Sequence, residues 1–205
     1  MRKMQQTNIT NKIDLFPTTI FESYKKFSDK DLLETFAAIH NNLNHTDEQC
    51  VLTYPDLHHN KKLKFMTDWI LNLSAEASTA WGYESQEMII RGMWGVKSTR
   101  HGGLKQHGHP GNWLCGCYYL DVHEEDHIIF HDPRARALAV QPKVKEWNNF
   151  NTPIARLKAK KYHFYVFPSW LEHSTEIVKH DKERISISWN IKLPNDLSSG
   201  YGDYG

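Results

Sequence analysis

Three histidines stand at positions from which they could bind one metal ion. His107 and His109 flank a single glycine, and in an extended segment residues i and i+2 point their side chains to the same side. His173 follows the aromatic, proline-containing stretch 167–171 at the start of an expected strand. An isolated pair of this kind is more often two solvated loop histidines. The third histidine favours a metal site over solvated loop histidines, because three imidazoles could bind a metal ion and leave coordination positions open.

Arg184 lies eleven residues after His173 and could serve the same site. We expect segments 174–178 and 184–193 to form a hairpin, because the polar residues 179–182 separate them. In that register His173 and Arg184 would be offset by about four residues, or roughly 13 Å. A five-carbon diacid that binds the metal at one end could reach the guanidinium with its other end.

The strand expected over residues 184–193 alternates between polar and apolar side chains. One face could line a ligand cavity while the other packs against helices. Arg184 and Ser186 could together bind a carboxylate, with the guanidinium as a bidentate donor and the hydroxyl as a further donor. The alternative is a surface arginine paired with Glu183 or Asp181. The polar face holds Arg184, Ser186, Ser188 and Asn190, and the apolar face holds Ile185, Ile187, Trp189 and Ile191.

The cysteines offer a weaker arrangement. Cys115 and Cys117 fall on one side of an expected strand, but only Cys50 remains besides them, so a four-thiolate zinc site is excluded. We expect small, buried cysteines there. An odd number of three cysteines suits a reducing compartment better than a disulfide framework, and we expect a cytoplasmic protein.

The secondary-structure elements that must position the candidate site residues are helices in the first part of the chain and strands in the second. The first part is mainly helical: one helix begins after Ser28 as N-cap, and a second spans about residues 62–81. Residues 44–60 between them are turn-rich. Beyond the second helix strands dominate, so we expect helices first and then an antiparallel barrel or jelly roll. Strands are expected over residues 15–21, 87–94, 113–120, 128–131 and 162–167, and a glycine-rich loop over 95–111.

Length and composition favour a single domain. The chain has 205 residues, and 25 Lys+Arg against 24 Asp+Glu leave a net charge of +1. That balance predicts no strong electrostatic attraction to nucleic acid or to a membrane surface. No stretch approaches the ~20 apolar residues that a membrane-spanning helix needs. The basic stretches 134–145 and 158–161 are expected to be solvated faces. We expect one domain over residues 14–193, a flexible N-terminus at 1–13 and a flexible tail at 194–205.

Five short motifs follow one another in a fixed order: His107-Gly108-His109-Pro110, Leu114-Cys115-Gly116-Cys117-Tyr118-Tyr119-Leu120, Phe130-His131-Asp132-Pro133-Arg134, Phe167-Pro168-Ser169-Trp170-Leu171-Glu172-His173 and Arg184-Ile185-Ser186-Ile187-Ser188-Trp189-Asn190. This series resembles the 2-oxoglutarate- and Fe(II)-dependent oxygenases, and within them the prolyl-4-hydroxylase-like group of unassigned substrate found in bacteria and tailed phages. The resemblance covers roughly residues 14–193. A phage origin would place the protein in the host cytoplasm.

The resemblance implies a double-stranded β-helix, which is a jelly-roll barrel preceded by helices. It also implies Fe(II) and 2-oxoglutarate as cofactors. His107 matches the first iron ligand and His173 the distal one. Arg184 matches the residue that binds the distal carboxylate of 2-oxoglutarate, and Ser186 matches its hydroxyl companion. Tyr119 could donate a hydrogen bond to the cosubstrate, although core packing is an equal alternative for it.

One position departs from the pattern of the wider superfamily. Most members carry a carboxylate two residues after the first histidine, where this chain has His109. We therefore predict a metal site formed by His107, His109 and His173. The missing negative charge should weaken divalent-metal binding or raise the iron potential. Asp132 is the alternative carboxylate ligand, and a turn cap before Pro133 is its plainer role.

For function, the resemblance implies an oxygenase that uses dioxygen to hydroxylate a peptide prolyl side chain or a small metabolite, with release of succinate and carbon dioxide. Two other functions stay open. One is a three-histidine cupin-like dioxygenase that does not use 2-oxoglutarate, and the other is a non-enzymatic jelly-roll binding module with a structural metal, for which His101 would be the fourth ligand. Substrate specificity depends on loops such as 95–106 and 133–161, and no pattern in their sequences indicates a substrate. The oligomeric state is equally hidden.

Overall fold

The computed structural model describes residues 11, 13–47, 50–134, 140 and 142–194. The flexible segments that we expect at residues 1–13 and 194–205 therefore lie almost entirely outside the described residues. Within them no helix is both long and apolar enough to cross a membrane.

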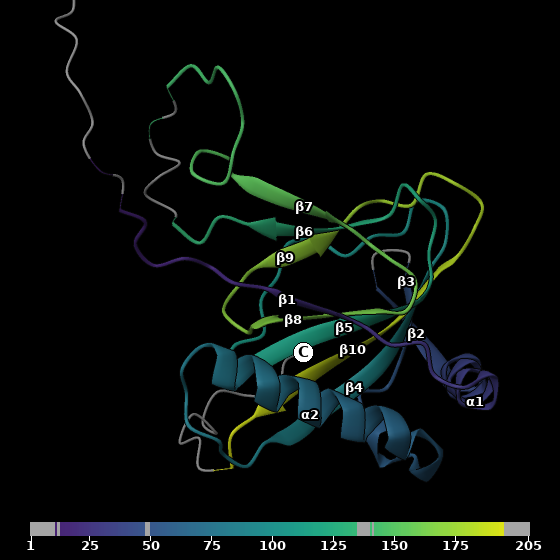
Figure 1. Ribbon diagram of the computed structural model, residues 1–205. Coiled ribbons are helices and arrows are strands. Elements are labelled where there is room, and N and C mark those ends of the chain that lie inside the picture. Colours follow the sequence, from purple (N-terminus) through teal and green to yellow (C-terminus); the bar gives the residue numbers. More distant parts are fainter. Residues whose placement is uncertain (1–10, 12, 48–49, 135–139, 141, 195–205) are drawn as a thin grey trace, which may run out of the picture.

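Two helices form early in the chain, as the apolar periodicity predicts. Helix α1 spans Asp29–His40, and the Ser28 hydroxyl caps it by accepting the backbone N–H of Asp31 at 3.2 Å. Helix α2 spans Lys64–Ala80 and follows two short 3-10 turns, η1 (Leu57–His59) and η2 (Lys61–Leu63). Figure 1 shows α2 lying across the face of a large sheet.

The strands form two antiparallel sheets, which confirms the expected jelly-roll architecture (Figure 1). The described residues give a large sheet of seven strands and a small sheet of three. In spatial order, the large sheet contains β1 (Phe21–Tyr24), β8 (His163–Pro168), β5 (Leu114–Asp121), β10 (Arg184–Lys192), β4 (Ile89–Ser98), β3 (Cys50–Thr53) and β2 (Leu43–Asp47). The small sheet contains β7 (Ile154–Lys158), β6 (His127–His131) and β9 (His173–Thr175).

Strand β10 separates the helix-side core from the interior of the barrel. Its apolar residues, from Ile185 to Ile191 at every second position, belong to the core cluster that includes Ile39 of α1 and Met66 of α2. The opposite residues Arg184, Ser186 and Ser188 line a cavity between the two sheets. The alternation expected from the sequence is thus confirmed, and β10 presents polar groups to the barrel interior.

One glycine on β5 is fixed by close packing. A Cβ atom at Gly116 would come within 2.2 Å of the Trp189 indole and 2.5 Å of the backbone oxygen of Tyr165. Neither neighbour can move easily, because the indole is fully buried and the oxygen belongs to the adjacent strand β8. Glycine at this position leaves room for the Trp189 indole to pack closely against β5.

The predicted hairpin of segments 174–178 and 184–193 is wrong. Strand β9 pairs with β6 in the small sheet, whereas β10 lies between β4 and β5 in the large sheet. The polar turn at 179–182 therefore carries the chain from one sheet to the other. His173 faces Phe130 and not Ser188, so the register behind the offset of roughly 13 Å does not exist in this fold.

Some strands were not predicted from the sequence. Residues 44–60, which were expected to form turns, contain most of β2 and all of β3, and β7 at the edge of the small sheet was not expected. The strand expected over 15–21 begins only at Phe21. These are edge or near-edge strands whose polar composition, as in Leu43–Asp47 with its sequence LNHTD, gives a weak periodic signal.

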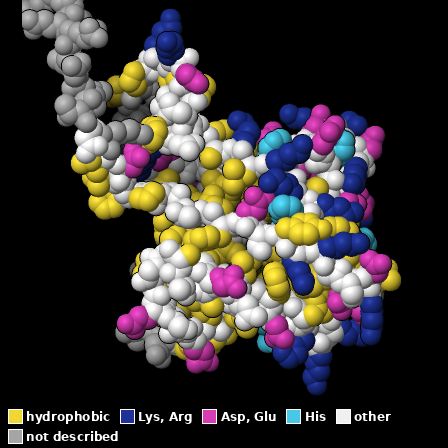
Figure 2. Space-filling view, in the orientation of Figure 1, with side chains coloured by type: hydrophobic (Ala, Val, Ile, Leu, Met, Phe, Trp, Pro, Cys, Tyr) yellow, Lys and Arg dark blue, Asp and Glu magenta, His cyan; other side chains and the backbone are white. Residues whose placement is uncertain are grey.

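The basic stretches behave as solvated faces. Figure 2 shows Lys and Arg side chains interspersed with Asp and Glu on the right of the view. Lys160 contacts Glu22 at 2.8 Å and Lys161 contacts Asp121 at 3.2 Å, and these are exposed or partly exposed pairs. Of the first stretch, Arg134 pairs with Asp132, while residues 135–139 lie outside the described part of the chain. Opposite charges therefore offset the basic side chains locally.

Candidate metal and cosubstrate site

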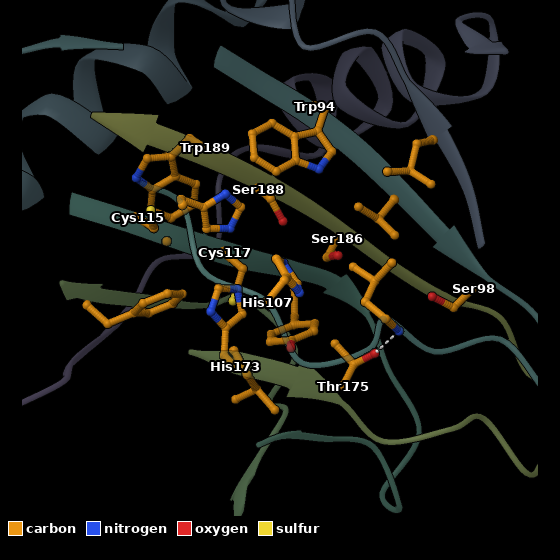
Figure 3. A pocket seen from close by; sticks show the side chains of 18 of the residues that line it. Trp94, Ser98, His107, Cys115, Cys117, His173, Thr175, Ser186, Ser188 and Trp189 are labelled. Atoms are coloured by element: carbon orange, nitrogen blue, oxygen red, sulfur yellow. Dashed lines mark hydrogen bonds between the residues drawn. The ribbon is translucent and has the colours of Figure 1, made fainter. Parts of the chain in front are cut away.

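The two sheets enclose a cavity of about 510 Å³ that opens to the surface (Figure 3). Polar groups reach it from both sheets, and Leu52, Trp94 and Val96 form part of its wall. Side chains from β4, β5 and β10 cover one side, and His173 and Thr175 of β9 cover the other. All six predicted site residues line this cavity: His107, His109, Tyr119, His173, Arg184 and Ser186.

Three of them form a cluster of imidazoles. One ligating nitrogen from each of His107, His109 and His173 lies within 4.8 Å of the other two. The ring centroids are 4.4 Å apart for His107 and His173 and 5.0 Å apart for His107 and His109. The described residues contain no other group of three His, Cys, Asp or Glu side chains that could hold a metal ion.

Backbone hydrogen bonds bring these histidines together. The N–H of His107 donates to the carbonyl of His173 at 3.0 Å, and the N–H of His173 donates to the carbonyl of His107 at 2.9 Å. The loop before β5 thus adds a short antiparallel pairing to the edge of β9. His109 is fixed separately, because its N–H donates to the carbonyl of Ser169 at 3.0 Å.

The ring orientations of two histidines are set by carbonyl groups. Nδ1 of His107 lies 2.7 Å from the carbonyl oxygen of Lys105, and Nδ1 of His173 lies 3.1 Å from that of Leu171. A carbonyl can only accept, so each Nδ1 carries the proton and each Nε2 keeps its lone pair. This is the tautomer that a metal-binding histidine requires.

Burial keeps two of the three imidazoles, those of His109 and His173, uncharged near neutral pH. It lowers the pKa of His173 to about 3, with the neighbouring imidazoles of His107 and His109 contributing in the same direction. Burial and His107 likewise lower the pKa of His109 to about 4. Both rings are therefore neutral at pH 7, so a metal would not have to displace protons from them. Neutral imidazole nitrogens are suitable ligands for iron, and this donor set fits Fe(II).

Arg184 lies at the other end of the cavity and is almost completely buried, with 2% exposure. Its Nη1 donates to Asp126 Oδ1 at 3.2 Å and to the carbonyl of Glu176 at 2.9 Å. Its Nη2 donates to Thr175 Oγ1 at 2.9 Å and lies 3.4 Å from Ser98 Oγ. The guanidinium is thus fixed from behind by groups of the protein, and Nε–H has no acceptor among the described residues.

Ser186 and Tyr119 stand next to each other on paired strands. They are register partners on β10 and β5, and both line the cavity. Tyr119 is 2% exposed, and burial raises the pKa of its phenol well above the ordinary value. The hydroxyl therefore keeps its proton and can act as a hydrogen-bond donor. Its neighbour Tyr118 points the other way, into the core beneath the helices, as the alternation of a strand requires.

Two alternative ligands from the sequence lie elsewhere. The carboxylate of Asp132 accepts two hydrogen bonds from the Arg134 guanidinium, at 2.9 and 2.8 Å, and one from its backbone N–H at 2.9 Å. Asp132 therefore has the role of a turn cap and does not reach the histidine cluster. His101 is not part of the cluster either; its backbone N–H donates to the carbonyl of Val178. Cys115 and Cys117 are free and buried in the cavity wall.

Two residues of the Arg184 end, Asp126 and Thr175, were not predicted from the sequence. Asp126 lies in a polar turn, where nothing distinguishes it from its exposed neighbours Glu124 and Glu125. Thr175 carried a usable signal, because it lies two residues after His173 on the same strand and must share its face. The contacts of both residues with Arg184 follow only from the fold, because β10 belongs to the other sheet.

Residues 92–190 match the family model described as "Putative 2OG-Fe(II) oxygenase". The matched segment contains all three histidines of the cluster, Arg184, Ser186 and Tyr119. This match assigns residues 92–190, and with them these six residues, to the 2OG-Fe(II) oxygenases. No curated protein matches the chain.

Solved structures share the fold of this 2OG-Fe(II) oxygenase. HygX from Streptomyces hygroscopicus, with nickel, 2-oxoglutarate and hygromycin B bound, aligns with a TM-score of 0.61 at 14% identity over 87% of this chain and 84% of its own. The 2-oxoglutarate-dependent epimerase SnoN of nogalamycin biosynthesis aligns with a TM-score of 0.61 at 12% identity over 86% and 77%. A 2OG-Fe(II) oxygenase from Burkholderia pseudomallei aligns with a TM-score of 0.58 at 11% identity over 88% and 86%.

The oxygenase match over residues 92–190, together with the shared fold, makes the protein a 2-oxoglutarate-dependent oxygenase that uses iron and 2-oxoglutarate. The same match sets aside the non-enzymatic jelly-roll module.

Proposed function

We propose that this oxygenase binds Fe(II) through the three-histidine cluster and 2-oxoglutarate through the opposite end of the same cavity. The observation that carries the proposal is that one cavity holds both a cluster of three imidazoles and a buried guanidinium. The proposed metal ligands are His107, His109 and His173, and the proposed cosubstrate-binding residues are Arg184, Ser186 and Tyr119.

Each group of the chain has a definite task in this proposal. The histidines present lone pairs on Nε2 and hold the metal at one place in the cavity. Arg184 binds the distal carboxylate of 2-oxoglutarate, and the hydroxyls of Ser186 and Tyr119 donate hydrogen bonds beside it. When bound, iron and 2-oxoglutarate supply the oxidising chemistry, with succinate and carbon dioxide as products. The enclosing walls keep water away from the reacting end.

We propose that the reaction is hydroxylation of a small metabolite or of a peptide prolyl side chain. The cavity volume of about 510 Å³ is in the range of small-molecule sites, roughly 300–1,000 Å³. Its apolar wall of Leu52, Trp94, Val96 and Leu104 suits the aliphatic part of such a substrate. HygX has been crystallised with hygromycin B, which favours the small-molecule alternative for the shared fold. We also propose a cytoplasmic location, since Cys50, Cys115 and Cys117 form no disulfide.

A titration without oxygen tests the proposal. Purified protein with Fe(II) should give a weak visible metal-to-ligand band on addition of 2-oxoglutarate. Arg184→Ala should weaken 2-oxoglutarate binding by about 100-fold, because it removes charge-assisted hydrogen bonds, and should leave Fe(II) binding unchanged. Absence of the band in the unmodified protein at saturating 2-oxoglutarate would count decisively against the proposal.

The cupin-like alternative, a three-histidine dioxygenase that does not use 2-oxoglutarate, is set aside by the oxygenase match, although His109 does stand in place of a carboxylate. Oxygen uptake by Arg184→Ala checks this. Uptake should disappear in this variant, and uptake at the unmodified rate would contradict a role of Arg184 in cosubstrate binding.

A further inference from the structure

The ring of His109 is held differently from the rings of the other two histidines in the cluster. Carbonyl groups fix the rings of His107 and His173 through Nδ1, at 2.7 and 3.1 Å. Neither ring nitrogen of His109 has a hydrogen-bond partner among the described residues. Its ring contacts only other rings there, with centroids 5.9 Å away for Trp94 and 5.2 Å away for His173. The direction of its imidazole therefore depends on how its backbone is held.

The backbone of His109 is held on both sides. Its N–H donates to the carbonyl of Ser169 at 3.0 Å. Its carbonyl accepts a hydrogen bond from Nδ2 of Asn112 at 3.2 Å, and the same Nδ2 lies 3.5 Å from the carbonyl oxygen of Pro110. An amide nitrogen carries two protons and can serve both carbonyls. Asn112 thus closes the turn 109–112, in which Gly111 has a positive φ of 77°.

Ser169 joins this turn to the segment that leads to β9. Its hydroxyl donates to the carbonyl of Asn112, and its N–H donates to the carbonyl of Trp113 at 3.2 Å. With the bond from His109, three hydrogen bonds link Ser169 to residues 109–113. Ser169 is 5% exposed, so water competes little for these bonds. The turn is therefore clamped against the chain that continues to His173.

The amide of Asn112 is better suited to donation than to packing. Its Oδ1 is buried and has no hydrogen-bond partner among the described residues. A buried acceptor without a partner costs free energy, so an apolar side chain of similar size would pack there at lower cost. What the amide provides is Nδ2, which faces the carbonyl oxygens of His109 and Pro110.

We propose that Asn112 and Ser169 are positioning residues that direct the imidazole of His109 toward the metal. Asn112 holds the carbonyl of His109 and Ser169 holds its N–H, in place of the ring hydrogen bond that the other two histidines have. The inference rests on the proposed function, since it requires that His109 binds the metal. Loss of a group that orients a metal ligand typically lowers metal affinity by roughly 10- to 100-fold.

Ni(II) binding to the metal-free protein, measured by calorimetry, tests this role. Ni(II) binds imidazole sites more tightly than Fe(II), so weakened variants remain measurable. Asn112→Leu keeps the size of the side chain and removes both the donors and the unpartnered acceptor. The matched control is Asn42→Leu, which removes another amide that donates to a backbone carbonyl, that of Ala38 in α1, at 2.7 Å.

A positioning role predicts a loss that acts through His109. Asn112→Leu should weaken Ni(II) binding about 10- to 100-fold, and Asn42→Leu should leave it unchanged. In a protein that already carries His109→Ala, the addition of Asn112→Leu should cause no further loss. If Asn112→Leu does not fold, Ser169→Ala carries the same predictions with a smaller loss of about 3- to 10-fold, the effect of one hydrogen bond.

Two results would overturn the inference. One is unchanged Ni(II) affinity in Asn112→Leu, and the other is an equal loss with and without His109→Ala, which would mean that Asn112 supports the cavity in general. Failure of the proposed metal site looks different, because then His173→Ala would bind Ni(II) as tightly as the unmodified protein.

Discussion

The two ends of the cavity are built in different ways. At the metal end, backbone hydrogen bonds between two neighbouring segments hold three imidazoles. At the carboxylate end, a buried charge is held by side chains and a carbonyl from several elements, including Asp126, Thr175 and Glu176. The first arrangement depends on two short segments and the backbone pairing between them, and the second on contacts with several elements. The difference explains why short motifs reveal the three histidines, Arg184 and Ser186, but not Asp126, the partner of Arg184.

The electrostatics of the two ends differ as well. Burial favours the uncharged form of His109 and His173, so these two imidazoles carry no positive charge near neutral pH when no metal is bound. The carboxylate end tolerates a buried cation because Asp126 lies against it. Changes at one end should therefore leave the other largely intact, and the following predictions test that separation.

The largest expected effect is loss of the metal ligand on β9. His173→Ala should abolish Fe(II)-dependent turnover of 2-oxoglutarate, because two imidazoles cannot complete the metal face. Metal content after dialysis and the rate of succinate formation measure the effect. His45→Ala, which changes an exposed histidine on β2, is the control and should behave as the unmodified protein. Full turnover by His173→Ala would show that the metal lies elsewhere.

Removing the counter-charge of Arg184 should destabilise the protein. Asp126→Ala leaves a buried guanidinium unpaired, and we expect the free energy of unfolding to fall by about 3–5 kcal/mol. The matched change Asp68→Ala breaks an exposed pair with Lys64 and should cost less than about 1 kcal/mol. Urea unfolding measures both. A small effect of Asp126→Ala, similar to that of Asp68→Ala, would mean that the two ends differ less than their burial indicates.

The metal-free protein should lose stability as the pH falls below 6.5. The unfolded chain takes up protons on histidine near pH 6.5, whereas His173 and His109 in the folded protein resist protonation down to pKa values of about 3 and 4. The unfolded state therefore binds more protons in this window, and folding becomes less favourable. At pH 5 each histidine should cost about 2 kcal/mol relative to pH 7.

Unfolding of the metal-free protein at several pH values, with His109→Gln as comparison, measures this dependence. The variant should show a shallower fall between pH 6.5 and 5, because one of the two buried imidazoles is gone. Identical slopes in the two proteins would contradict the assignment of the effect to the histidine cluster.

The smallest expected effect is at Ser186. Its hydroxyl is one donor among several at the carboxylate end, so Ser186→Ala should weaken 2-oxoglutarate binding only about 3- to 10-fold. The titration described above measures it, and Ser188→Ala on the same strand face is the matched control. A loss as large as that of Arg184→Ala would mean that Ser186, and not the guanidinium, dominates carboxylate binding.

Much of the fold follows from sequence patterns that depend on near neighbours. The Ser28 cap, the apolar spacing of α2 and the alternation along β10 all have a local physical cause, and the structure reproduces each of them. The meeting of His107 with His109 is local in the same sense. Their approach to His173 is not local, and the family resemblance supplied it.

The errors arise where distant segments decide the structure. The polar turn at 179–182 suggested a hairpin because a short polar turn between two strands usually joins neighbours in one sheet. In a jelly roll the same turn crosses between sheets, which no local pattern indicates. Asp126 and Thr175 were missed for the same reason, since each matters only through contact with Arg184.

The most direct test of the central claim is a crystal structure grown without oxygen in the presence of Fe(II) and 2-oxoglutarate. Anomalous scattering should place one iron within bonding distance of Nε2 of His107 and His173 and of a nitrogen of His109. The far carboxylate of 2-oxoglutarate should lie against Arg184. An iron bound by Asp132 or by only two of these histidines, or a 2-oxoglutarate that points away from Arg184, would contradict the account.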